Sequence, residues 1–201
     1  MKKFLAAVLL LAAGAATAGP VELIKNGSFE KNGVNANTWT IMSALDGWTV
    51  GPNGAEVRNN IAGAAKDGNN YLELDSTANS WISQSFNTIS GAQYNLSFFY
   101  APREHTAAST NGIDVFWNGN LLKHVAEDNF TSLTQWQKID LSMFAIGNLS
   151  TLQFKASGIS DGYGGSLDNV SMSVKVPEPG TLASILLGLG MLGFTLRRRQ
   201  K

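Results

Sequence analysis

Three aromatic residues stand in polar, turn-rich surroundings of the kind that sugar-binding sites use. Trp39 and Trp81 each follow a run rich in Asn, Ser and Thr, and Tyr163 lies between two glycines. Sugar-binding modules place an aromatic ring against a pyranose ring and surround it with amides or carboxylates. We therefore predict that Trp39, Trp81 and Tyr163 contact a ligand. The alternative is that they fill a core or anchor a loop, a role that suits Trp48 and Trp117 better.

Asp168 is a carboxylate in a segment that is otherwise apolar on one face. Counting in steps of two puts it on the same face as Val170, Met172 and Val174, which should point into the protein. A buried carboxylate without a partner is costly, so it needs a cation, backbone N–H groups or a basic side chain. The alternative places Asp168 at the mouth of the strand, where it caps a turn.

The residues that enzymes commonly use show no recognisable arrangement. His105 and His124 lack the spacing of metal ligands. Neither a G-x-S-x-G nucleophile motif nor a phosphate-binding loop is present. Two carboxylates could still converge from separate loops to cleave a glycosidic bond, but no pair stands out. We therefore predict that the protein is not an enzyme.

Alternation of apolar and polar residues recurs along the central part of the chain and predicts β-strands. Pairs such as Asp-Gly and Ser-Gly separate the strands, and Asn118-Gly119 predicts a type I′ hairpin turn. No long amphipathic helix is found, and residues 53–65 are predicted to form a loop. The pattern indicates an all-β antiparallel sandwich, a jelly roll, over residues 19–175. The clearest alternating runs are 93–101, 113–118, 136–143, 152–156 and 170–174.

Six short motifs are spread over residues 23–174 of this predicted sandwich. They are Asn26-Gly27-Ser28-Phe29-Glu30, Gly47-Trp48, Tyr71-Leu72-Glu73-Leu74-Asp75, Ile82-Ser83-Gln84-Ser85-Phe86, Tyr94-Asn95-Leu96-Ser97-Phe98 and Leu167-Asp168-Asn169-Val170. Their order resembles that in galactose-binding-like jelly rolls, in particular the DUF642 and choice-of-anchor C type domains. Relatives of this fold include many carbohydrate-binding modules, although a fold by itself does not determine function.

The same resemblance implies a structural calcium ion. In related jelly rolls, the glutamate of the opening motif and an aspartate of the last strand help to bind calcium. The matching residues in this chain are Glu30 and Asp168. Calcium takes about six to eight oxygen ligands, so backbone carbonyls of residues 26–28 would have to contribute. The alternative leaves Glu30 in solvent.

Residues 1–18 have the three parts of a secretion signal. Lys2 and Lys3 precede an apolar run at residues 4–13, and residues 16–18 have the Ala-Thr-Ala pattern that signal peptidase recognises. The apolar run is too short to cross about 30 Å of hydrocarbon as a helix. We therefore predict export and cleavage by signal peptidase after Ala18.

Residues 176–201 form a second targeting segment. Val176-Pro177-Glu178-Pro179 precedes an apolar stretch at residues 182–196, which is followed by Arg197-Arg198-Arg199. This pattern resembles the PEP-CTERM sorting signal of Gram-negative bacteria, which implies processing by an exosortase in hosts that typically make exopolysaccharide. The basic end should stay in the cytoplasm, so the apolar helix would anchor the protein in the inner membrane at least transiently. The alternative is an ordinary tail anchor that is not cut.

The amino-acid composition further limits which functions and partners the sequence favours. Fifteen basic and fifteen acidic residues give a formal net charge of zero, which does not favour nucleic acid as a partner. The chain has no cysteine, so an exported fold cannot depend on disulfides. We expect a protein of the cell surface or extracellular matrix that binds exopolysaccharide without catalysis. The rivals are a structural biofilm protein that binds other proteins and, third, an envelope hydrolase.

Overall fold

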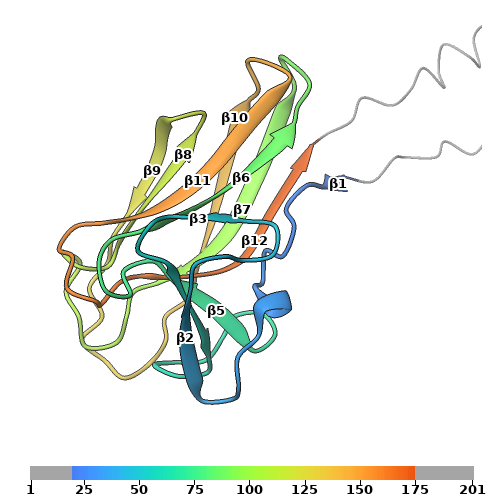
Figure 1. The fold of residues 1–201 in the computed structure, drawn as a ribbon. Helices are drawn as coiled ribbons and strands as arrows, with labels where there is room; N and C mark the ends of the chain where they lie inside the picture. The colour runs from blue at the N-terminus through green and yellow to red at the C-terminus, as the bar shows by residue number, and fades with distance from the viewer. Residues whose placement is uncertain (1–19, 175–201) are drawn as a thin grey trace, which may run out of the picture. The chain divides into compact units, whose positions relative to one another are not determined.

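Two antiparallel β-sheets pack face to face, which confirms the predicted sandwich (Figure 1). The computed structural model describes residues 20–174. One sheet has the strand order β10-β7-β12-β5-β4-β2, with β1 paired to β12, and the other has the order β3-β6-β11-β8-β9. The elements are β1 (Val21–Glu22), the 3-10 helix η1 (Glu30–Asn32), β2 (Thr38–Met42), β3 (Thr49–Val50), β4 (Ala55–Asn59), β5 (Asn70–Glu73), β6 (Trp81–Asn87), β7 (Gln93–Ala101), β8 (Gly112–Trp117), β9 (Asn120–Val125), β10 (Gln137–Phe144), β11 (Leu149–Ser157) and β12 (Ser166–Val174).

The core lies between the two sheets because the alternating apolar residues of both point inward. Phe98 of β7 meets Phe154 of β11 edge to face, with ring centroids 5.1 Å apart. Trp48 and Trp117 are buried in this core, as the sequence predicted. Residues Val21–Lys175 form one compact unit that contains the whole core, so we expect this unit to fold on its own.

The predicted hairpin is confirmed, and the predicted loop at residues 53–65 is wrong in part. Asn118 and Gly119 both have positive φ, 51° and 78°, as a type I′ turn requires. Residues Ala55–Asn59 form β4, which lies between β2 and β5 in the larger sheet. The Gly and Asn residues around β4 suggested a loop. The segment is nevertheless a strand because β2 and β5 hydrogen-bond to it on either side, and the local sequence contains no information about these partners.

Asp168 does not share a face with Val170, so the prediction from strict alternation is wrong. The register of β12 against β7 shifts between Asp168 and Ser171, and Asn169 there has a φ of 46°. This bulge places an extra residue in β12 and reverses the faces on its two sides. Leu167 and Val170 therefore both enter the core, while Asp168 pairs with Phe99 on the outer side of the sheet.

No helix within residues 20–174 is long and apolar enough to cross a membrane. The predicted secretion signal at 1–18 and the predicted sorting segment at 176–201 lie outside the described residues.

Candidate functional site

A pocket of about 380 Å³ opens at one end of the sandwich, over the outer side of β4 and β5. Three parts of the chain build it: β2 and β4, the segment that follows β7, and the loop between β11 and β12. Its lining combines aromatic, cationic and acidic side chains, namely Trp39, Glu56, Arg58, Ile61, Ala62, Ser76, Arg103, Asp161, Gly162 and Tyr163.

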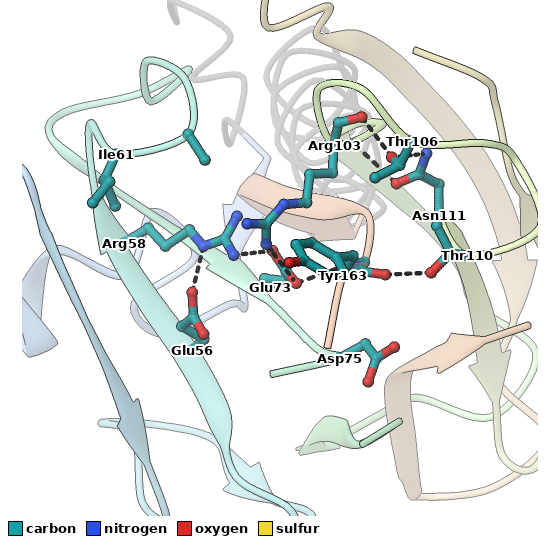
Figure 2. Close-up of polar contacts among 12 residues, drawn as sticks. Glu56, Arg58, Ile61, Glu73, Asp75, Arg103, Thr106, Thr110, Asn111 and Tyr163 are labelled. Carbon is teal, nitrogen blue, oxygen red and sulfur yellow. Dashed lines mark hydrogen bonds and ion pairs between the residues drawn. The ribbon is translucent and has the colours of Figure 1, made fainter. Parts of the chain in front are cut away.

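A buried ion-pair network lies beneath the pocket (Figure 2). The carboxylate of Glu73 is fully buried and forms ion pairs with the guanidinium groups of Arg58 and Arg103, the second at 3.0 Å. The Gly164 N–H donates to the same carboxylate at 2.8 Å, and Arg58 Nε donates to Glu56 at 2.5 Å. Two arginines are thereby held at fixed positions by charge-assisted hydrogen bonds from elements far apart in the sequence.

Burial shifts the protonation of these groups. Burial raises the pKa of Glu73 to about 7, and the charges of Arg58 and Arg103 offset part of that rise. Burial alone would lower the pKa of Arg58, but the carboxylates of Glu73 and Glu56 outweigh it and raise that pKa. Arg58 is therefore a permanent cation. Its Nη1 is buried and has no hydrogen-bond partner within residues 20–174, which is a cost that the ion pairs of the same guanidinium offset.

Two half-exposed aromatic rings stand at this pocket. Trp39, on the edge strand β2, is 51% exposed and lies opposite Arg58 in the pairing of β2 with β4. Tyr163 is 49% exposed, and the guanidinium of Arg103 lies over its ring at 4.5 Å from the centroid. Thr110 holds the Tyr163 loop by donating from Oγ1 to the Tyr163 carbonyl at 2.5 Å. Both rings are therefore half-exposed, and hydrogen bonds fix the backbone that carries each of them.

Trp81 does not belong to this pocket. It begins β6 in the smaller sheet and is half-buried. Its ring packs closely over Gly51, where an added Cβ would lie 2.9 Å from the indole. Of the three aromatic residues predicted to contact ligand, the structure therefore brings Trp39 and Tyr163 together and leaves Trp81 elsewhere.

The two carboxylates predicted to bind calcium both hold one loop, residues 66–70. Glu30 accepts backbone N–H bonds from Asn69 and Asn70 at 2.8 and 2.7 Å. Asp168 accepts two more, from residues 66 and 67, at 2.8 and 2.9 Å. Burial raises the pKa of Asp168 to about 7, although these N–H groups offset part of the rise.

These N–H donors approach the carboxylate oxygens where a cation would otherwise bind, so neither residue depends on a cation for a partner. Within residues 20–174, no group of three or more His, Cys, Asp or Glu side chains is placed to hold a metal ion. A calcium ion would have to displace N–H donors and draw on backbone carbonyls. Calcium binding at Glu30 and Asp168 therefore stays a prediction.

Sequence reasoning missed the charged residues of the pocket. In β4 and β5, Glu56, Arg58 and Glu73 alternate with the core residues Val57 and Leu72, which puts all three on the outer side. This alternation is visible in the sequence and could have predicted that the three charged side chains share one face of the sheet. The pairing that sets Glu56 opposite Glu73, with Arg58 bridging them, is a tertiary fact that alternation does not contain.

Two family models match the chain. Residues 22–173 match the family described as "Protein of unknown function (DUF642)". Residues 175–199 match the PEP-CTERM protein-sorting motif, which implies an exported, surface-sorted protein that an exosortase processes. Among curated relatives, the chain is 28% identical over 151 residues to a multifunctional-autoprocessing repeats-in-toxin of Vibrio cholerae and 29% identical over 150 residues to that of Vibrio vulnificus. The matches cover 74% of this chain but 3% of each toxin.

Solved structures that align with this chain include two enzymes and a carbohydrate binding module. A Stig cyclase from Fischerella sp. TAU aligns over 80% of this chain and 100% of its own, with a TM-score of 0.59 and 14% identity. The arabinose-bound α-L-arabinofuranosidase MgGH51 aligns over 76% of this chain and 26% of its own, with a TM-score of 0.50 and 18% identity. A family 35 carbohydrate binding module from Clostridium thermocellum aligns over 67% of this chain and 97% of its own, with a TM-score of 0.45 and 19% identity. At these identities the likeness concerns the fold, whereas the match over residues 22–173 shows that the chain belongs to the DUF642 family.

Proposed function

We propose that this domain is a non-catalytic carbohydrate-binding module of the galactose-binding-like jelly-roll type, displayed outside the cell after sorting. The ligand site is the pocket beside Trp39 and Tyr163. One observation carries the proposal: two half-exposed aromatic rings, Trp39 and Tyr163, border a pocket that is also lined by the fixed guanidinium of Arg103. Sugar sites combine these same elements, an apolar face for the ring and fixed polar groups for its hydroxyls.

Each group has a role in this proposal. Trp39 stacks on a sugar ring, the partly exposed guanidinium of Arg103 donates to a hydroxyl oxygen, and the carboxylates of Glu56 and Asp161 accept from hydroxyl groups. The charges of the pocket favour a neutral ligand. Two guanidinium groups, Arg58 and Arg103, face the three carboxylates of Glu56, Glu73 and Asp161, so no excess positive charge is available for a phosphate or sulfate.

The arrangement of Glu73 supports binding without catalysis. Its pKa of about 7 would suit a general acid, but the side chain is fully buried. Both of its oxygens already accept hydrogen bonds, from Arg103 and Gly164. A general acid must reach the proton acceptor on its substrate, and Glu73 has no free path to one.

The test is a binding screen of residues 19–175 against a glycan array and soluble polysaccharides, followed by Trp39→Ala and Trp81→Ala. Trp39 is half-exposed, so its removal should leave the melting temperature nearly unchanged while affinity falls about tenfold, as the loss of one stacked ring implies. Trp81→Ala should leave affinity unchanged. Loss of binding with Trp81→Ala alone would move the site to the other sheet and contradict the proposal.

The rival functions have their own outcomes in this screen. A folded domain that binds no glycan across a broad panel, but captures another surface protein, would favour a structural biofilm role. Release of reducing sugar from a bound polysaccharide, lost in Asp161→Asn, would favour an envelope hydrolase.

A further inference from the structure

Four large apolar side chains are exposed together at the end of the sandwich opposite the pocket. Ile89 lies in the turn after β6, Phe144 ends β10, Ile146 lies in the turn that follows, and Leu149 begins β11. They are 59%, 62%, 80% and 64% exposed, respectively. We call these four residues the apolar tip. Single exposed apolar residues are ordinary, but a group of four on adjoining turns requires an explanation.

The two turns of the apolar tip are bonded to each other, so the side chains stand on a fixed support. Ser90 Oγ donates to the Ile146 carbonyl at 2.9 Å, and the Gly91 N–H donates to the Ala145 carbonyl at 2.7 Å. The Thr88 N–H donates to the Asn148 carbonyl at 2.9 Å. These bonds satisfy polar backbone groups internally. Such satisfaction is a condition for placing backbone in or near a lipid phase.

The turns of the apolar tip are also free of charge. Residues 87–92 read Asn-Thr-Ile-Ser-Gly-Ala and residues 144–149 read Phe-Ala-Ile-Gly-Asn-Leu, without one ionisable side chain. The opposite end carries Arg103, Asp161 and the buried ion pairs. The two ends are separated by the nine residues of β7, which span about 30 Å at about 3.3 Å a residue.

The chain leaves the sandwich at the apolar tip. The last residue of β12, Val174, pairs with Tyr94 at the start of β7, and Gln93 beside it pairs with Phe144 (Figure 1). Eight backbone steps separate Val174 from the apolar segment that starts at Leu182, a distance of at most about 30 Å when fully extended. Residues 182–196 carry no charge and are predicted from the sequence to lie in the membrane, so this short connection keeps the sandwich close to the bilayer.

We infer that the apolar tip inserts into the outer leaflet of the lipid bilayer while the chain is held by its C-terminal segment. The partner is lipid, not a second copy of the chain. The four side chains lie at the end of the sandwich and on both of its outer sides, Phe144 on the larger sheet and Leu149 on the smaller. The uncharged turns and the short connection to the membrane segment favour lipid, because apolar side chains held beside a bilayer can bury their surface at its interface. This arrangement directs the pocket away from the membrane.

The test uses the absence of cysteine, which allows single labels to be placed. Ile146→Cys and, as a matched control, Ile159→Cys are made in residues 19–201 and labelled with a polarity-sensitive nitrobenzoxadiazole probe. Ile159 is also exposed and apolar, at 56%, but its N–H binds the Ser109 carbonyl, close to Thr110 of the pocket end. Each protein is reconstituted into vesicles of phosphatidylethanolamine and phosphatidylglycerol, with and without lipids that carry a spin-label quencher.

The label at position 146 should shift its emission to shorter wavelength and be quenched severalfold by the labelled lipids, while the label at 159 should do neither. Replacing Ile89, Phe144 and Leu149 together by Asn in the Ile146→Cys protein should abolish the quenching. Persistent quenching in that variant would mean that the tether alone brings the probe near the lipid, which would overturn the inference. A blue shift that lipid quenchers do not touch, and that disappears on dilution of the protein, would overturn it in favour of self-association.

Discussion

The stability of this domain should depend on pH through Asp168. Its side chain is fully buried on the outer side of β12, beneath residues 66–67, and burial raises its pKa from the usual 3.8 to about 7. The folded protein therefore holds a proton at a pH where the unfolded chain has already released it. The contribution of Asp168 to stability should therefore be complete below about pH 4, fall as the pH rises towards 7, and level off above that.

The size of this effect follows from the two pKa values. The difference between 3.8 and about 7 is about three pKa units, which at about 1.36 kcal/mol each corresponds to about 4 kcal/mol of unfolding free energy. For a domain of this length, that is on the order of 10 °C in melting temperature. Replacing Asp168 by Asn removes the titration. The amide also places an NH₂ group where the Asn169 N–H needs an acceptor, so two donors face each other. The cost of this mismatch does not change with pH.

The assay is urea unfolding of residues 19–175 at intervals from about pH 5 to about pH 8, for the natural protein and for Asp168→Asn. The difference between the two free energies isolates Asp168, because Glu73 and every other titrating group contribute equally to both curves. We expect that difference to change by about 2.7 kcal/mol over this range, since about two of the three pKa units fall between pH 5 and the folded pKa of about 7. Parallel curves for the natural protein and Asp168→Asn would refute the argument.

Three further predictions address calcium, backbone packing and the ion-pair network. If calcium binds at Glu30 and Asp168, millimolar calcium at pH 7 should raise the melting temperature and remove the pH dependence described above, and an unchanged melt would count against a calcium site. Gly27→Ala should destabilise the domain by more than about 2 kcal/mol, because the added Cβ would lie 1.9 Å from the Val170 carbonyl oxygen. Gly147→Ala, with no atom within 4 Å of its added Cβ, should be nearly neutral in the same denaturation experiment. Arg58→Met should cost about 3 kcal/mol at pH 8 and less at pH 6, where Glu73 can take up a proton in place of its lost partner; equal costs at both pH values would contradict this account.

Local patterns in the sequence were sufficient for most of the strands and for the core. Alternation predicted β7 at its observed bounds, and the positive φ at Asn118 and Gly119 follows from residue types that tolerate it. Both signals arise within a few residues of chain, where side-chain spacing alone decides which face is buried. The sorting motif is local in the same sense, and its identification needed no structure.

The site depended on information that no local pattern holds. Trp39 and Tyr163 were candidates from their polar surroundings, but only the packing of β2 near the loop before β12 separates them from Trp81. The partners of Glu73 come from β4, from the segment after β7 and from the loop before β12, and their meeting is a consequence of strand order.

The bulge at Asn169 shows most clearly where sequence patterns end and tertiary structure decides the outcome. The sequence by itself determined that Val170 and Met172 point inward, because each is apolar in an alternating run. The tertiary structure decided that Asp168 does not join them, since one extra residue in β12 reverses the faces of the strand. That reversal exchanges a carboxyl group without partners in the core for one that accepts hydrogen bonds from the 66–67 backbone, and the energetic cost of burying an unsatisfied polar group selects the second arrangement.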